Sequence, residues 1–147
     1  MDAAWIERMR WWLLGVLTIG MLGTITELLL LEHYEKPLQF VPLILIVAAL
    51  GTMVRQVRKH DLRSLMVLKW IMALFVLAGF AGVLAHFQGA AEFQLENDPN
   101  MDTWVLFTKI LHTQAPPLLA PGMMLQLGLI GLVYVYSDAR IRVRKAT

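Results

Sequence analysis

Four long apolar stretches constrain this chain more than any other feature of its sequence. They cover about residues 11–31, 38–54, 65–85 and 122–136. A helix that crosses a bilayer needs about 20 mainly apolar residues, so 147 residues hold four spans and short loops but no separate soluble domain. The sequence therefore predicts an all-α fold, an integral membrane four-helix bundle that forms a single transmembrane domain over residues 1–147.

The first stretch follows basic residues, as the apolar part of a signal peptide does. It is longer than such a segment, and no Ala-x-Ala cleavage pattern stands at its end. We therefore expect it to be retained as the first spanning helix. The chain has no cysteine, which excludes disulfides and thiolate metal ligands.

Prolines divide the last apolar region. Pro116, Pro117 and Pro121 remove backbone donors and clash with the preceding turn, so one continuous helix across them is not expected. The pattern instead predicts a short amphipathic helix over about residues 102–114, lying at the outer membrane surface, followed by a span over about residues 122–136.

Basic residues gather on the side of the membrane that holds both termini. Because positive loops stay in the cytoplasm, this pattern predicts cytoplasmic termini. The net charge of +2 sits beside apolar spans and forms no separate basic surface, so no nucleic acid partner is expected. The residues on this side are Arg8, Arg10, Arg55, Arg58, Lys59, Arg63, Lys69, Arg140, Arg142, Arg144 and Lys145.

Small residues mark helix faces that are suited to close packing. In the first span, Gly20 and Gly23 share a face with Glu27. We expect this face to meet another helix, because small residues let helix backbones approach in lipid. Gly79 and Gly82 share a face of the third span at a similar depth, so the first and third spans are one pair that could pack closely. In the last span, Gly128 and Gly131 have the same helix-packing role.

Histidine and glutamate side chains recur at the predicted outer face. Imidazole nitrogen and carboxylate oxygen are ligands for divalent transition metals such as zinc, copper, iron or manganese. Haem held by His86 with His33 or His112 is a second alternative. An ordinary hydrogen-bonded acidic rim is the third, since no HExxH motif is present. The candidate metal ligands are Glu27, His33, His86, Glu92 and His112.

Two further segments lie outside the spans. Residues 86–99 are predicted to form an acidic, aromatic outer loop, which with residues 115–122 offers a surface for a protein partner. The basic tail is expected to contact anionic lipid headgroups through Arg140, Arg142, Arg144 and Lys145.

Three sequence patterns carry a resemblance. They are TELLLLEHY at residues 26–34, HxxGxxEFxxExxP at residues 86–99 and APGxMxQLGLxGL at residues 120–132. The chain resembles a group of small, uncharacterised four-helix membrane proteins of bacteria. The resemblance implies the bacterial cytoplasmic (inner) membrane as the location, and it implies no activity, cofactor or residue role.

The sequence contains no phosphate loop, serine triad order or dinucleotide fingerprint, which favours a protein that is not an enzyme. Its small size and glycine-lined helix faces predict a non-catalytic accessory or structural subunit of a membrane protein assembly, in contact with other subunits or with copies of itself. An outer-face metal- or haem-binding protein in redox or transport is the alternative. A small transporter or channel is a third reading, and the lack of acidic residues in the inner halves of the spans disfavours it.

Overall fold

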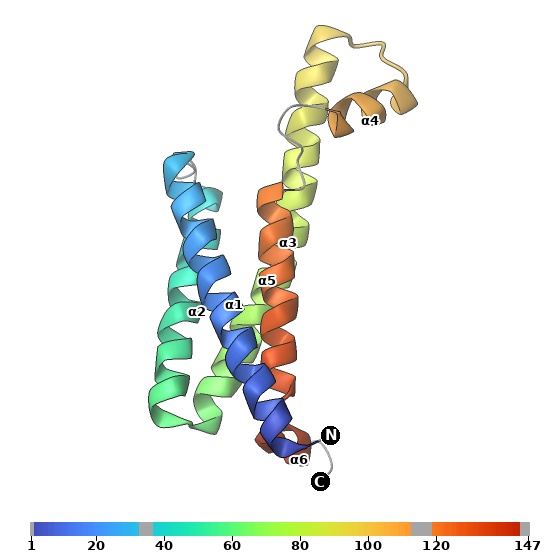
Figure 1. The fold of residues 1–147 in the computed structure, drawn as a ribbon. Helices are drawn as coiled ribbons and strands as arrows, with labels where there is room; N and C mark the ends of the chain where they lie inside the picture. Colours follow the sequence, from blue (N-terminus) through green and yellow to red (C-terminus); the bar gives the residue numbers. More distant parts are fainter. Residues whose placement is uncertain (1, 33–36, 113–118, 145–147) are drawn as a thin grey trace.

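The protein is a bundle of long helices in which the first helix begins and the last helix ends at the same end (Figure 1). A computed structural model describes residues 2–32, 37–112 and 119–144, and every regular element in these ranges is helical. The expected all-α class is therefore confirmed. The elements are α1 (Ala3–Leu30), η1 (Pro37–Gln39), α2 (Phe40–Lys59), α3 (Leu62–Asn97), α4 (Thr103–Leu111), α5 (Leu119–Tyr136) and α6 (Ala139–Arg144).

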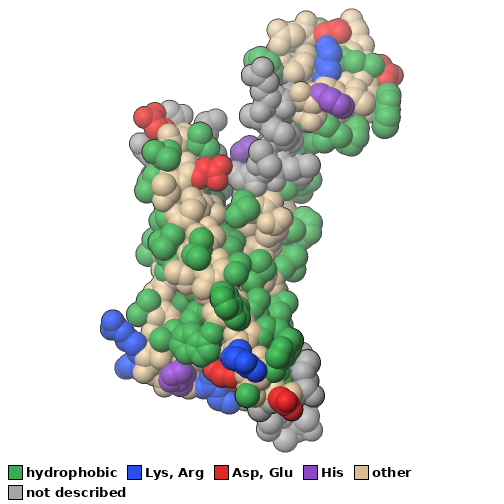
Figure 2. Space-filling model, viewed as in Figure 1, with side chains coloured by type: hydrophobic (Ala, Val, Ile, Leu, Met, Phe, Trp, Pro, Cys, Tyr) green, Lys and Arg blue, Asp and Glu red, His purple; other side chains and the backbone are tan. Residues whose placement is uncertain are grey.

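Three of the helices are long and apolar enough to cross a membrane. They are α1, α2 together with η1, and α3. The apolar part of α5, Pro121–Tyr136, is shorter than these three. Hydrophobic side chains cover the middle of the bundle, while Lys and Arg gather at the end where α1 begins, called the terminal end below (Figure 2). This is the surface expected of a membrane protein.

Helix α3 is much longer than the sequence predicts. Asp61 caps its start, since a side-chain oxygen accepts a hydrogen bond from the backbone N–H of Ser64. The helix then runs 36 residues, or about 54 Å, which exceeds the roughly 30 Å of a bilayer core. The outer loop expected over residues 86–99 is thus helical as far as Asn97. Alanine, glutamate, glutamine and leucine in this stretch favour helix, and Pro99 supplies the first strong break.

Helices α3 and α5 pack backbone against backbone. A Cβ atom at Gly79 would lie 2.8 Å from the backbone nitrogen of Leu125, and one at Gly128 would lie 2.9 Å from the carbonyl oxygen of Met72. Gly131 lies against the Met72 side chain in the same interface. Any side chain at these glycines would push the two helices apart, so their absence of a Cβ sets the spacing of this pair.

Helix α1 packs on α5 and α2, so its glycine face meets another helix as expected, although not α3, the pair that the sequence also offered. A Cβ at Gly20 would lie 2.6 Å from a methyl group of Leu127 in α5. At Gly23, no heavy atom within the described ranges lies within 4 Å of the corresponding position. The glycine face of α1 therefore meets a leucine of α5 at one point and is open at the next turn.

Helix α4 folds back onto the far half of α3. Asp102 caps it by accepting a hydrogen bond from the backbone N–H of Trp104 at 2.9 Å. The rings of Phe107 and Phe87 lie 6.0 Å apart between centroids, and Ile110 is fully buried. Trp104 stacks on Phe107 at 5.9 Å but stays 70% exposed. The contact side of α4 is thus apolar and fixed to α3, and a large aromatic ring remains on its surface.

Candidate functional site

The predicted outer metal ligands do not converge within the described part of the chain. Glu27 and Glu92 are exposed on different helices. The Nδ1 atom of His86 donates to the carbonyl of Gly82 at 2.9 Å, and the Nδ1 atom of His112 donates to the carbonyl of Thr108 at 2.8 Å. In residues 2–32, 37–112 and 119–144, no group of three His, Asp or Glu side chains is placed to hold a metal ion. His33 lies outside those ranges.

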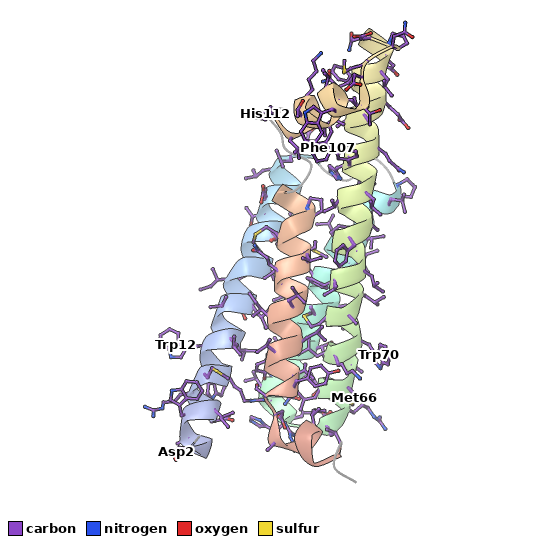
Figure 3. All side chains as sticks on the ribbon, turned by 90° about the vertical axis from the view of Figure 1, so that its right-hand side faces the viewer. Asp2, Trp12, Met66, Trp70, Phe107 and His112 are labelled. Atoms are coloured by element: carbon purple, nitrogen blue, oxygen red, sulfur yellow. The ribbon has the colours of Figure 1, made fainter. Side chains whose placement is uncertain are left out.

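Both ring bonds are local contacts within a single helix turn. Figure 3 shows His112 at the end of α4, close to Phe107 and beside the far half of α3. Because a carbonyl oxygen only accepts, Nδ1 carries the ring proton in both histidines. The metal-ligand and polar-rim alternatives share this bond, since metal-ligating histidines also donate their second ring nitrogen to a carbonyl.

A buried ion pair at the terminal end is the best-defined polar feature of the molecule. Nη2 of Arg10 in α1 lies 2.7 Å from Oδ2 of Asp138, which follows α5, and each side chain is only 8% exposed. A buried charge is costly unless it is paired and hydrogen-bonded. This pair thus ties the start of α1 to the end of α5.

Arg10 has further partners that occupy its remaining nitrogens. Nη1 donates to the carbonyl of Tyr134 at 3.1 Å and approaches Oγ of Ser137 at 3.5 Å. Nε lies 3.6 Å from a carboxylate oxygen of Glu7. The guanidinium carbon lies 4.6 Å from the centre of the Tyr134 ring, within cation–π range. Each of the three guanidinium nitrogens therefore has a partner within the protein.

Arg140 extends this network to the turn between α2 and α3. Its guanidinium binds Asp138 in a bidentate manner, with Nε donating to Oδ1 at 2.9 Å and Nη2 donating to Oδ2 at 2.8 Å. Its Nη1 also donates to the carbonyl of His60. With its amide oxygen facing Arg140, Gln56 accepts a bond from Nη2 at 3.0 Å and donates to the carbonyl of Asp61 at 2.9 Å. We call the set Arg10, Gln56, Ser64, Tyr134, Asp138 and Arg140 the terminal network.

The α2–α3 turn is shaped to receive these bonds. His60 ends α2 in the left-handed conformation, with φ of 48°, which reverses the chain direction. Arg55 pairs with Asp61 at 3.1 Å, and the hydroxyl of buried Ser64 bonds to the Gln56 side chain. The turn carbonyls of His60 and Asp61 thus face the terminal network.

Two acidic groups of this region are held in the ionised form. Burial opposes ionisation of Asp138, but hydrogen bonds from the side chain and backbone of Arg140 and the charge of Arg10 outweigh it, so the pKa of Asp138 lies below its ordinary value. The backbone N–H of Ser64, with the charge of Arg55, lowers the pKa of Asp61. Both carboxylates therefore stay charged at neutral pH.

A partly open crevice borders the terminal network. Four α1 residues line it, at the spacing of one helix face: Glu7, Arg10, Trp11 and Leu14. The opposite wall is the end of α2, with Gln56, Val57 and His60. Tyr134 of α5 also lines it. We call this feature the terminal crevice.

Sequence reasoning missed the terminal network because it treated the basic residues as topology signals. Asp138 interrupts an otherwise basic tail, and that acidic residue was the available signal of an internal partner. Arg140 binds Asp138 and the α2–α3 turn, and its expected contact with lipid headgroups stays a prediction. The side chains of Arg142 and Arg144, and all of Lys145, lie outside the described residues.

No protein-family model, curated protein or solved structure matches this chain. The resemblance of residues 26–34, 86–99 and 120–132 to small bacterial membrane proteins therefore stays an expectation.

Proposed function

We propose that this protein is a four-span membrane protein that serves as a non-catalytic accessory or structural subunit of a membrane protein assembly, with both termini cytoplasmic. The observation that carries the proposal is that the charged and small side chains in the described ranges bind other parts of the same bundle. Charged side chains at the terminal end bind one another and the helix ends, and the α3–α5 interface is closed by backbone contact. Both arrangements serve to hold helices together.

The fourth span in this proposal is α5. It is 18 residues long and lies against α3, whose length exceeds a bilayer. A helix shorter than the hydrocarbon thickness is tolerated when neighbouring helices and flanking residues compensate. The exposed basic residues Arg8, Arg58 and Lys59 at the terminal end support the cytoplasmic assignment.

The position of α4 supports an interfacial helix at the outer surface. Lys69 lies over the Trp70 ring at 5.0 Å, and Trp70 projects away from the bundle near the terminal end (Figure 3). A Lys–Trp pair of this kind suits a membrane boundary. Phe87 lies about 18 residues, or about 27 Å, beyond Lys69 along α3. Because Phe107 contacts Phe87, α4 falls near the opposite boundary of a core about 30 Å thick.

The outer hairpin, which we define as residues 90–111, is the surface offered to another subunit. The end of α3 carries Phe93, which is 63% exposed, together with exposed Glu92 and Glu96. By the depth argument above, Phe93 lies just beyond the hydrocarbon core, in the headgroup layer, where aromatic side chains are common. We propose this ring, between the exposed carboxylates of Glu92 and Glu96, as the contact for a second subunit.

Photo-crosslinking from two positions tests the proposal. A photoreactive residue at Phe93 on the outer hairpin is compared with one at Leu77, which is 64% exposed on the part of α3 within the bilayer. Gentle detergent extraction and mass spectrometry of the intact assembly are run on the same membranes. We expect protein adducts from position 93 and mainly lipid adducts from position 77.

Two outcomes contradict the accessory role. One is a stable monomer that forms no protein adduct from either position. The other is a stoichiometric metal or a haem absorbance band that disappears in His86→Ala, which would establish the metal- or haem-binding alternative instead.

A further inference from the structure

One amide side chain lies exposed and without a hydrogen bond in the fourth proposed span. Gln126 belongs to the apolar part of α5, Pro121–Tyr136, which holds no other amide and no charged group. Within residues 2–32, 37–112 and 119–144 its side chain makes no hydrogen bond. A carboxamide carries two N–H donors and an oxygen that accepts. In hydrocarbon these groups are costly unless a partner satisfies them.

The contacts of α5 with α3 place Gln126 near the middle of the membrane. The adjacent Leu125 lies opposite Gly79 of α3, where a Cβ atom would lie 2.8 Å from the Leu125 backbone nitrogen. Gly79 is ten residues, or about 15 Å, beyond Lys69, which lies at the membrane boundary proposed above. This distance is half of a hydrocarbon core about 30 Å thick. The amide is therefore too far from both headgroup layers to reach water.

Other uncharged polar side chains of the spans are satisfied inside the chain. Each threonine hydroxyl of α1 and α2 donates to the carbonyl four residues earlier, at 2.7 to 2.8 Å; these residues are Thr18, Thr24, Thr26 and Thr52. Buried Gln56 and Ser64 bond to each other at the terminal end. Gln126 differs from all of these, so its amide needs a partner that the described part of the chain does not supply.

The face of α5 that carries this amide is open to a second helix. Its residues recur at the spacing of one helix face, and we call them the glutamine face: Gly122, Gln126, Leu129 and Val133. Leu129 and Val133 are 49% and 54% exposed. At Gly122, no heavy atom of the described residues lies within 4 Å of a Cβ position. A glycine one turn from the amide lets another backbone approach closely.

We propose that the glutamine face binds the same face of a second copy of this chain, with the two Gln126 amides hydrogen-bonded to each other in the middle of the membrane. This inference rests on the proposed function, which makes α5 a membrane span. Copies inserted in the same orientation are related by a two-fold axis along the membrane normal, so equal residues meet at equal depth. An amide is complementary to itself, because the N–H of each copy donates to the oxygen of the other. A second copy thus supplies the missing polar partner by symmetry.

Single cysteines test the contact directly, because the chain has no cysteine of its own. Leu129→Cys on the glutamine face is compared with Leu77→Cys, whose side chain is 64% exposed on α3. Both full-length variants are oxidised in membranes with copper phenanthroline. We expect a disulfide-linked dimer from position 129 and none from position 77.

The role of the amide is tested by energy transfer between labelled copies in proteoliposomes. We expect Gln126→Leu to associate about tenfold more weakly, since it loses the paired hydrogen bonds. Gln126→Asn keeps an amide and should retain most of the association. Thr26→Val is the matched control, because it removes a hydroxyl that already bonds within its own helix, and it should associate as the wild type does.

Three results would overturn the second copy as the occupant. They are equal dimer yields from positions 129 and 77, unchanged association in Gln126→Leu, and a disulfide from position 129 to a different protein. A glutamine face that stays monomeric while position 93 still gives protein adducts would overturn this inference alone. A chain that does not insert into membranes would contradict the proposed function, and this inference with it, so the two failures are distinguishable.

Discussion

The two ends of the bundle treat their polar residues in opposite ways. At the terminal end, Arg10 and Asp138 are buried and bind each other across two helices. At the far end, Glu27, His86 and His112 are exposed, and both histidines bond to a carbonyl of their own helix. Helix positions are therefore fixed by side-chain chemistry at one end and mainly by apolar and glycine packing elsewhere. Changes at the terminal end should consequently affect the whole fold, while changes at the far end should act locally.

The largest effect is expected from Asp138→Ala. Removing this carboxylate leaves Arg10 buried without its main counter-charge, which costs about 3–5 kcal/mol of unfolding free energy. Asp98→Ala, an exposed acid at the far end, is the control and should change stability by less than about 0.5 kcal/mol. Thermal unfolding of the purified protein in detergent measures both.

A coupling measurement sharpens this result. Asp138→Ala should cost less in an Arg10→Ala background, because the buried cation that needs the carboxylate is gone. Equal costs in the two backgrounds would mean that Asp138 acts through Arg140 alone.

A smaller effect is expected from crowding the α3–α5 contact with an added methyl group. In Gly128→Ala the new methyl group would lie 2.9 Å from a backbone oxygen of α3, and such overpacking costs about 1–3 kcal/mol. Gly23→Ala adds the same group at a position with open space among the described residues, and alanine favours helix by up to about 1 kcal/mol there. Unfolding curves in detergent should therefore show lower stability for Gly128→Ala and higher stability for Gly23→Ala. Shifts of both variants in the same direction would show that α3 and α5 are not this close.

Acid should weaken the terminal end specifically. The pKa of Asp138 is lowered by folding, so its stabilising contribution is complete above the unfolded value of about 3.9 and is lost as pH falls through the folded value. Wild-type stability should thus fall below about pH 4 more steeply than that of Asp138→Asn, which has no carboxyl group to protonate there. Identical pH profiles would show that Asp138 is not ionised in the folded protein.

The smallest effect on stability is expected at Trp104. This side chain is 70% exposed, so Trp104→Phe should change the unfolding free energy by less than about 0.5 kcal/mol. If α4 lies in the outer headgroup layer, lipids brominated near the headgroup should quench the fluorescence of Trp104. Trp104→Phe should then remove this quenched part of the signal. Trp70→Phe at the other boundary is the control, and a Trp104 signal that no brominated lipid quenches would place α4 in water.

Some of this architecture follows from local sequence. Continuous apolar runs require helices in lipid, since every backbone group must be bonded within its own segment. The runs therefore predict the helical class and the apolar surface, and Asp61 and Asp102 carry the local signals for helix starts. The extension of α3 to Asn97 was missed because residues 86–97 are polar enough for a loop, although they are also good helix formers.

The tertiary structure decided which surfaces meet. The glycines of α1 predict a close contact but not its partner, because lipid-facing leucines and buried leucines have the same chemistry. Only the packing shows that Gly20 meets Leu127 of α5 and that Gly23 is open. In the same way, Arg10 and Asp138 are ordinary boundary residues in the sequence, and their pairing depends on α1 crossing the end of α5. Composition thus indicates a membrane protein, and three-dimensional contact decided which of its polar groups pair in the terminal network.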